Sequence, residues 1–525
     1  MKNSFNCISK FTGAILLLIT FVLFNISPIT AQQPNNNIII YADSGKSTIS
    51  RHIYGQFSEH LGHCIYGGLW VGENSTIPNT NGVRNDIIDA LKRIKIPNLR
   101  WPGGCFADEY HWMDGIGPKD KRPKIVNTNW GGVTEDNSFG TNEFLNMCEV
   151  LGTEPYISAN AGSGTVEEMA KWVEYMNADG ESPMANMRRQ NGREKPWNVK
   201  FLGIGNESWG CGGNMRPEFY SDVFRKYSTY CKDYGNSRLF KIASGAPDFY
   251  YDWTETLMKN IGNRMNGISL HYYTVKGWDG SKGSATDFTG DEYFETLKKC
   301  EAIETALKNH IAIMDKYDPE KKISLMVDEW GTWFDTEPGT NPAFLFQQNT
   351  MRDAFVAALT LNIFHKYCDR VKMANIAQLV NVLQALILTN NEKMILTPTY
   401  FVFDLYKVHH DAAYLPLSIN SEKYIVNNDT LDAVSATASR DSMGTIHISL
   451  VNINPDKDIS ITCSLEGFSP DKASGSIITS GNIKDYNTFE EPNKIGIKEF
   501  NNFKIDSGKL IINMPAKSII GIGLK

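Results

Sequence analysis

One segment, Val199-Lys-Phe-Leu-Gly-Ile-Gly-Asn-Glu-Ser-Trp-Gly210, has the pattern of a buried strand that ends in the pair Asn206–Glu207. A second segment, Ile323-Ser-Leu-Met-Val-Asp-Glu-Trp-Gly331, likewise delivers Glu329 after a mostly apolar run. Parallel barrel strands present polar side chains at their C-terminal rim in this way. Two rim glutamates are the minimum for glycoside hydrolysis, in which one protonates the leaving oxygen while the other attacks the anomeric carbon or activates water. Either glutamate alone could be a solvated loop residue, but the matching strand ends favour catalysis.

Strand patterns alternate with helical patterns along most of the chain. The strands are expected at 53–57, 96–101, 155–158, 199–206, 239–244, 267–271, 323–329 and 373–378. Such alternation predicts a parallel sheet, and eight units suit an α/β fold of the (β/α)8 TIM-barrel type with long loops. A doubly wound open sheet is the alternative. No glycine-rich phosphate loop follows the first strand, which argues against its dinucleotide-binding form.

The sequence pattern changes after about residue 407, where helical patterns no longer separate the expected strands. Short alternating strands at 445–450, 459–465, 475–479 and 510–514 stand between Asn, Asp, Gly and Pro clusters, which is typical of an antiparallel sandwich. A lone strand at 38–41 has no helix after it and could join that sheet. The predicted organisation is therefore a signal peptide at 1–31, an N-terminal strand at 32–48 that joins the sandwich, a catalytic barrel at 49–407 and a C-terminal, jelly-roll-like β-sandwich at 408–525.

Residues 1–31 have the pattern of a secretory signal peptide. Lys2 and Lys10 precede an apolar run at 13–24, and the small residue Ala31 offers a cleavage site. We therefore expect export to the periplasm or the medium, with an uncleaved N-terminal anchor as the alternative. The formal net charge of −7 argues against nucleic acid or anionic lipid as a partner, whereas a neutral carbohydrate is indifferent to it.

Further polar residues follow the expected strands. They are Glu59 and His60 after the first strand, Arg100, Trp101 and Cys105 around the second, His271, Tyr272 and Tyr273 after the sixth, and Gln378 and Asn381 after the eighth. Sugar recognition needs such hydrogen-bonding groups together with aromatic side chains. Each one alone could be a satisfied core or surface group, but their convergence on one barrel face favours a carbohydrate site. His271 has no second His or Cys nearby at ligand spacing, so we expect no metal and no cofactor.

Six segments resemble, in the same order, the family-51 glycoside hydrolases. They are Tyr54–Gly62, Leu99–Gly104, Asp114–Pro118, Gly205–Glu207, Val327–Trp330 and Ala377–Asn381. That clan-A family consists of retaining α-L-arabinofuranosidases with a (β/α)8 barrel and a C-terminal β-sandwich. The resemblance implies an exo-acting enzyme that releases terminal α-L-arabinofuranosyl residues from arabinan, arabinoxylan or their oligosaccharides by double displacement. It also implies a possible homo-oligomer.

The resemblance further implies roles for individual residues. Glu207 would be the acid/base and Glu329 the nucleophile, and the negative charge of Glu329 should raise the pKa of Glu207. Asn206 would bind the sugar 2-hydroxyl. The rest of the arabinose subsite would be formed by Glu59, His271, Tyr273 and Gln378.

Cys105 departs from the family pattern, because Asn is common at this position. A thiol is a weak hydrogen-bond donor, so the sugar contact expected of Cys105 is in doubt. Cys64, on another rim loop, could form a disulfide with Cys105 in an oxidising compartment, although spacing cannot establish the pairing.

Two other functions remain open from the residues. Another retaining clan-A glycanase, acting internally on xylan or glucan, would use the same two glutamates and Asn206. A non-catalytic carbohydrate-binding protein is the third possibility, which the presence of both glutamates disfavours.

Overall fold

Eight parallel strands close into a barrel in the computed structural model, which describes residues 36–525. In chain order they are β2 (Gly55–Phe57), β5 (Asn98–Trp101), β8 (Glu154–Ala159), β9 (Phe201–Ile204), β10 (Phe240–Pro247), β11 (Gly267–Thr274), β12 (Ser324–Thr332) and β13 (Val371–Ala377). Each strand pairs with the next one along the chain, and β13 closes the ring by pairing with β2. The predicted (β/α)8 barrel is confirmed, and the open sheet is wrong.

The first barrel strand is shorter than predicted. Ile53 and Tyr54 belong to a 3-10 turn at Arg51–Tyr54, and the strand begins only at Gly55. The signal peptide predicted at 1–31 lies outside the described residues. None of the helices in the described part of the chain is long and apolar enough to cross a membrane.

Nine α-helices occur among residues 36–525, and most of them follow barrel strands. They are α1 (Asn85–Ile94), α2 (Thr141–Leu151), α3 (Val166–Asn177), α4 (Pro183–Gln190), α5 (Pro217–Tyr230), α6 (Tyr251–Ile261), α7 (Gly290–Tyr317), α8 (Met351–Lys366) and α9 (Pro398–Tyr406). Helices cover the outside of the barrel and side chains fill its inside, so a strand such as β9 is buried along its whole length.

Local sequence determines where several of these helices begin. At α7, Thr289 and Glu292 form a reciprocal capping box. At α3 only half of such a box forms, because Thr165 accepts a hydrogen bond from the Glu168 amide while the Glu168 carboxylate lies 2.9 Å from His111 Nδ1. That carboxylate thus ties α3 to the loop after β5 instead of capping its own helix.

An apolar plug fills the barrel interior. Tyr156, Phe201, Ile242, Met326 and Met373 come from five different strands and pack together, each nearly inaccessible to solvent. Side chains in such layers make the inside of a TIM barrel a packed core rather than a pore. Polar side chains further along the same strands therefore lie at the C-terminal mouth.

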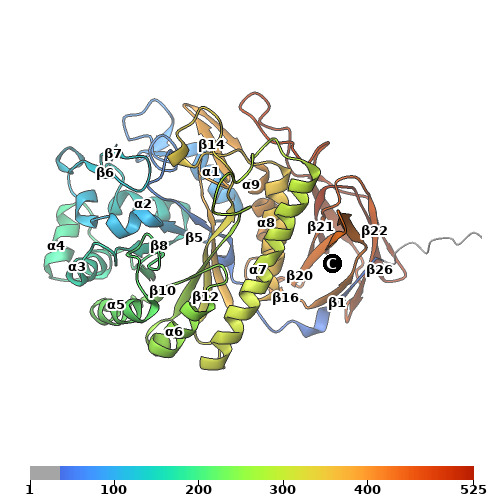
Figure 1. Ribbon diagram of the computed structural model, residues 1–525, viewed down its shortest axis with the longest axis horizontal. Coiled ribbons are helices and arrows are strands. Elements are labelled where there is room, and N and C mark those ends of the chain that lie inside the picture. The colour runs from blue at the N-terminus through green and yellow to red at the C-terminus, as the bar shows by residue number, and fades with distance from the viewer. Residues whose placement is uncertain (1–35) are drawn as a thin grey trace, which may run out of the picture. The chain divides into compact units, whose positions relative to one another are not determined.

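Two sheets form the C-terminal sandwich (Figure 1). One contains, in spatial order, β17 (Leu417–Asn420), β1 (Asn37–Tyr41), β22 (Ile459–Glu466), β26 (Lys509–Met514) and β25 (Phe503–Asp506). The other contains β16 (Ala413–Tyr414), β20 (Val434–Arg440), β21 (Ile446–Asn452), β27 (Ser518–Leu524), β23 (Ala473–Thr479) and β24 (Lys498–Glu499). The early strand β1 pairs antiparallel with β17 and parallel with β22, so the first strand of the described chain lies in a sheet whose other strands come from the C-terminal region.

Buried polar contacts join the sandwich to the barrel helices. His409 lies between Ser439 and Ser449, with ring nitrogens 2.7 and 2.8 Å from their hydroxyls. Burial lowers the pKa of His409 well below its ordinary value, so this contact is made by a neutral ring. Tyr293 of α7 donates a hydrogen bond to the carbonyl of Ile453 at 2.8 Å.

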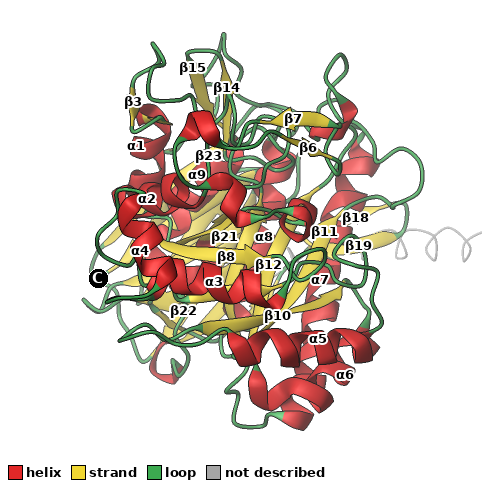
Figure 2. Cartoon of the chain, turned by 90° about the vertical axis from the view of Figure 1, so that its left-hand side faces the viewer, coloured by secondary structure: helices red, strands yellow, loops and turns green. Residues whose placement is uncertain are grey.

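Small hairpins extend the loops of the barrel. They are β3 (Asn79–Thr80) with β4 (Val83–Arg84), β6 (Ile125–Asn127) with β7 (Val133–Glu135), and β14 (Ile387–Asn390) with β15 (Lys393–Leu396), while β18 (Lys423–Val426) and β19 (Asp429–Asp432) belong to the C-terminal region. The first three follow the barrel strands β2, β5 and β13, and Figure 2 shows β3, β6, β7, β14 and β15 at one end of the molecule. They build up the rim at the C-terminal ends of these neighbouring strands.

Candidate active site

A pocket of about 480 Å³ opens at the C-terminal ends of the barrel strands. Seven of the eight predicted site residues line it, namely Glu59, Cys105, Glu207, His271, Tyr273, Glu329 and Gln378. The eighth, Asn206, is 2 % exposed and lies beneath the pocket. Four tryptophans that the sequence analysis did not select also contribute to the wall, Trp130, Trp209, Trp278 and Trp333.

The two glutamates face each other across the pocket. A carboxylate oxygen of Glu207, one of Glu329 and a ring nitrogen of His271 all lie within 4.8 Å of one another. Glu207 follows β9 with a φ of 40°, while Glu329 lies within β12, directly opposite His271 in the β11–β12 pairing. The turn after β5 also approaches closely, since a Cβ on Gly104 would lie 3.1 Å from Glu329 Oε1.

Both oxygens of Glu329 are held by hydrogen bonds. Arg100 Nη1 donates to Oε1 at 2.8 Å, and the Tyr273 hydroxyl donates to Oε2 at 2.8 Å. Burial alone would lower the pKa of Arg100, but the carboxylates of Asp328 and Glu329 raise it above its ordinary value. The guanidinium therefore remains charged, and Glu329 is fixed in position.

Glu207 has a different environment. Burial raises its pKa above the ordinary value and the nearby Glu329 adds to this, whereas the hydrogen bond with His271 opposes it. His271 Nδ1 lies 2.9 Å from Glu207 Oε1 and 3.4 Å from Glu329 Oε2, and Nε2 lies 3.3 Å from Asp328 Oδ1. Burial alone would lower the pKa of His271, but these three carboxylates raise it to about 10. His271 is thus a cation that donates to Glu207.

Glu59 and Gln378 also line the pocket. Gln378 Nε2 donates to Glu59 Oε2 at 2.9 Å, while Glu59 Oε1 accepts from Trp130 Nε1 at 2.9 Å and from the Phe106 amide at 3.2 Å. Burial, together with the charge of Glu329, raises the pKa of Glu59 to about 7. These contacts hold a rigid set of donors and acceptors at the base of the pocket.

Buried residues below the pocket position the reacting groups. Arg100 Nη2 donates to the side-chain oxygen Oδ1 of Asn206 at 2.7 Å, and Asp108 Oδ2 accepts from the backbone N–H of Asn206 at 2.8 Å. Asp328 accepts from the Tyr156 hydroxyl at 2.6 Å. From the sequence, Arg100 was expected on the rim without a role, and no role was expected for the two aspartates. For Arg100 and Asp328 the available signal was a charged residue inside an otherwise apolar strand, in Leu99-Arg-Trp101 and Val327-Asp-Glu329, whereas Asp108 lies in a 3-10 turn.

Comparisons with known proteins agree with this geometry. Residues 90–288 match the family described as "Alpha-L-arabinofuranosidase 1 domain", and residues 328–518 match "Alpha-L-arabinofuranosidase C-terminal domain". The crystal structure of a GH51 arabinofuranosidase from Xanthomonas axonopodis pv. citri is 47 % identical, with a TM-score of 0.93 over 94 % of this chain and 100 % of that one. The chain belongs to glycoside hydrolase family 51.

Two further relatives define the activity. An α-L-arabinofuranosidase from Thermotoga maritima, solved with arabinose, is 32 % identical with a TM-score of 0.82, covering 93 % of this chain and 99 % of that one. A Bacteroides ovatus protein named "Intracellular exo-alpha-L-arabinofuranosidase" is 60 % identical over 97 % of this chain and 99 % of its own. The enzyme is an exo-α-L-arabinofuranosidase that acts on arabinose-containing substrates.

The Bacteroides relative also corrects the predicted location. A protein 60 % identical over nearly the whole chain is named intracellular, which points against export of the arabinofuranosidase. The prediction of a periplasmic or extracellular enzyme is therefore wrong. It rested on two lysines, a short apolar run and a small residue near the N-terminus, a pattern of composition that does not by itself specify export.

The predicted disulfide partner of Cys105 is also wrong. Cys105 is bonded to Cys211, 106 residues away, and Cys64 is a buried free thiol. Cys211 reaches this position because the loop after β9 turns back, with the amides of Gly210 and Gly212 donating to the Glu207 carbonyl. A disulfide sulfur has no proton, so Cys105 cannot make the predicted donor contact to the sugar. For the same reason, the 3.5 Å approach of Cys211 Sγ to Glu207 Oε2 is a van der Waals contact.

Among residues 36–525 of the arabinofuranosidase, two clusters have the residue types of metal ligands. In the first, the sulfurs of Cys105 and Cys211 are consumed by the disulfide, beside Glu207. In the second, Glu207 and Glu329 surround His271, whose pKa of about 10 leaves both ring nitrogens protonated. A histidine ligand must offer a deprotonated nitrogen and a cysteine ligand a thiolate, so neither His271 nor the two sulfurs can bind an ion as they stand.

Proposed function

We propose that the enzyme is a retaining exo-α-L-arabinofuranosidase that trims arabinan, arabinoxylan or their oligosaccharides by double displacement. The observation that supports this most directly is the placement of oxygens of Glu207 and Glu329 within 4.8 Å of one another. Retaining glycosidases place the two carboxyl groups about 5 Å apart, while inverting enzymes separate them by about 6.5–9.5 Å to admit a water molecule.

The environments of the two carboxyl groups suggest which role each one has. Glu329 is fixed at both oxygens by Arg100 and Tyr273, as a nucleophile aimed at one carbon atom should be. Glu207 has a raised pKa, and its Oε2 approaches only the disulfide sulfur among its recorded polar neighbours. That oxygen is therefore free to give a proton to the leaving group.

In the first step, Glu329 attacks the anomeric carbon while Glu207 protonates the departing oxygen. In the second, Glu207 removes a proton from water, which attacks the glycosyl ester and releases arabinose with its original anomeric configuration. Asn206 would donate to the sugar 2-hydroxyl through Nδ2, because Arg100 already holds its Oδ1.

The shape of the pocket supports action at chain ends. Glu59, Gln378 and Trp130 are bonded together on one side, where they would surround the hydroxyls of a terminal arabinofuranose. Trp209, two residues after Glu207, and Trp278, whose ring contacts that of Tyr273, also line the pocket, where they would contact the leaving group. Cys105 would contribute a disulfide surface rather than a hydrogen bond.

The test is the stereochemistry of transfer. With an aryl α-L-arabinofuranoside as donor and methanol as acceptor, NMR should detect methyl α-L-arabinofuranoside. The β-anomer would contradict double displacement. Hydrolysis of aryl β-D-xyloside or β-glucan at a comparable rate would instead favour a broader clan-A glycanase.

A further inference from the structure

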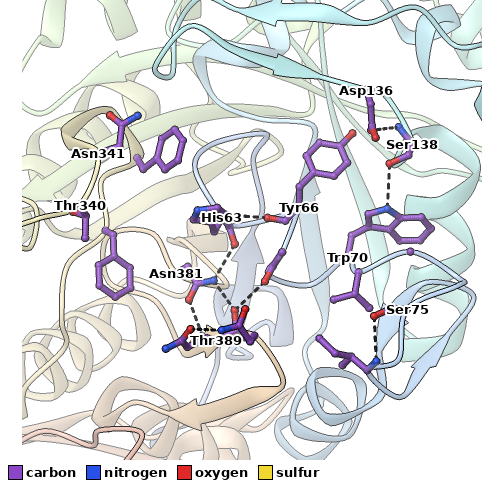
Figure 3. A pocket seen from close by; sticks show the side chains of 18 residues that line it. His63, Tyr66, Trp70, Ser75, Asp136, Ser138, Thr340, Asn341, Asn381 and Thr389 are labelled. Carbon is purple, nitrogen blue, oxygen red and sulfur yellow. Dashed lines mark hydrogen bonds between the residues drawn. The ribbon is translucent and has the colours of Figure 1, made fainter.

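A second and larger groove lies on the same rim as the catalytic pocket. Its volume is about 890 Å³, compared with about 480 Å³ for the pocket that contains Glu207 and Glu329. Figure 3 shows Thr340 and Asn341 on one side and Trp70, Asp136 and Ser138 on the other, with His63, Tyr66, Asn381 and Thr389 between them. No part of the proposed reaction uses this groove.

Three loop segments form a shared wall between the two cavities. Leu61, Leu345 and Leu383 line the catalytic pocket, while their near neighbours in the chain, His63, Phe344 and Asn381, line the groove. The loops touch at Gly62, where φ is +51° and a Cβ would lie 2.8 Å from the Cβ of Phe344. The groove is therefore continuous with the rim of the catalytic pocket.

Hydrogen bonds make the floor of the groove rigid. Asn381 Nδ2 donates to the His63 carbonyl at 3.0 Å and to Thr389 Oγ1 at 2.8 Å, and Asn381 Oδ1 accepts from the Thr389 amide at 2.8 Å. Thr389 Oγ1 donates in turn to the Gly67 carbonyl at 3.3 Å. These bonds join the loop after β13 to the loop after β2, so the groove is preformed.

The lining combines aromatic rings with uncharged polar groups. Of the 18 described residues that line it, Asp136 is the only Asp, Glu, Lys or Arg, in a protein that carries a formal charge of −7. His63 Nδ1 contacts the Tyr66 carbonyl and Asn341 Oδ1 accepts from the Ala343 amide, while no hydrogen bond to His63 Nε2 or Asn341 Nδ2 is recorded among the described residues. The half-buried rings of Phe344 and Tyr66 lie nearby. Aromatic faces beside amide and imidazole groups suit sugar rings and their hydroxyls.

We propose that this groove, centred on His63 and Asn341, binds the neutral pentose backbone of an arabinose-bearing oligosaccharide or polysaccharide and so retains it while its branches enter the catalytic pocket. The inference rests on the proposed function, because it assumes an arabinose-containing glycan longer than the catalytic pocket can hold. The near absence of charge favours a neutral glycan over an acidic one, because the lining contains no lysine or arginine that could pair with an acidic sugar.

The experiment uses the full-length enzyme and the double variant His63→Ala/Asn341→Ala. Both residues are exposed, and neither lines the catalytic pocket. Asn236→Ala is the matched control, because Asn236 is exposed and precedes β10 at the opposite end of the barrel. Binding is measured by affinity electrophoresis in gels that contain arabinan, arabinoxylan or polygalacturonate, and kcat/KM is measured on an aryl α-L-arabinofuranoside.

The wild type and Asn236→Ala should be retarded by the neutral polymers but not by polygalacturonate. The double variant should bind the neutral polymers about five- to tenfold more weakly, the effect of losing one or two polar contacts, with unchanged kcat/KM on the aryl substrate. Equal retardation of variant and wild type, no retardation of the wild type, or equal retardation by polygalacturonate would overturn the inference. Retention of polymer binding by a wild type that releases no arabinose would support the groove and refute the proposed function instead.

Discussion

Replacing Glu207 with alanine should separate the two steps of the reaction. A positioned acid or base contributes about 10²- to 10⁴-fold, so release of arabinose from polysaccharide should fall by that factor. An aryl group of low pKa needs little protonation, so Glu207→Ala should still form the glycosyl-enzyme from such a substrate. Water would then attack slowly for want of a base, giving a burst of phenol about equal to the enzyme concentration.

The structure also predicts chemical rescue of this variant. Truncation of Glu207 leaves space beside the Cys105–Cys211 disulfide and His271, and the carboxylates of Glu329 and Asp328 still raise the pKa of His271, which favours a cation able to attract azide. Azide needs no base, so steady-state turnover of the aryl substrate should recover with an α-L-arabinosyl azide as product. The measurements are stopped-flow absorbance of the phenol and NMR of the azide, with Glu329→Ala as a control that shows no burst. Lack of rescue, or a β-azide, would refute the assignment of Glu207 as acid/base.

Three other perturbations follow from the contacts. Tyr273→Phe removes the 2.8 Å hydrogen bond to Glu329. Because a hydrogen bond to a charged group contributes about 1.5–3 kcal/mol, kcat/KM should fall at least about tenfold, while thermal stability should change little. Unchanged kinetics would contradict a role of Tyr273 in orienting the nucleophile. Glu59 has a pKa of about 7 in the folded protein, so it binds its proton more tightly when folded than when unfolded; its contribution to stability is present below about pH 4.5 and is lost as the pH rises through 7. Glu59→Gln should therefore flatten this part of the curve of Tm against pH. An unaltered slope would count against the raised pKa. Cys211→Ala removes the disulfide to Cys105 and should lower the free energy of unfolding by about 2–5 kcal/mol. Added reductant should lower the Tm of the wild type but not that of the variant. An equal change of Tm in both proteins would argue against the disulfide.

The sequence predicts the barrel well because the decisive signals are local. Apolar runs such as 201–204 and 324–327 have to be buried on both faces, and helical patterns between them leave little choice but a parallel sheet. The exact start of the first strand escaped prediction, since Ile53 and Tyr54 are equally apolar in a strand or in a buried 3-10 turn.

The candidate site was predictable as a set of residues but not as a network. A polar residue at the end of an apolar strand predicts a position at the barrel rim, and both glutamates do line the pocket there. Pairing between loops far apart in sequence is different, because Cys105 and Cys211 meet only once the loop after β9 folds back. Likewise, the hydrogen bonds from Arg100 to Asn206 and Glu329 join different barrel strands, so the spacing of residues along the sequence cannot predict them.

The two buried cations at the barrel mouth have a consequence for how one carboxyl group can serve twice. In the proposed mechanism Glu329 is the nucleophile. Its carboxylate and that of Asp328, whose pKa lies below its ordinary value, offset the positive charges of Arg100 and His271 while Glu207 carries its proton. Ester formation at Glu329 removes one anion and leaves a surplus positive charge. The ionisation of Glu207 restores the balance, so the covalent step itself converts the acid into a base, with no movement of any side chain required.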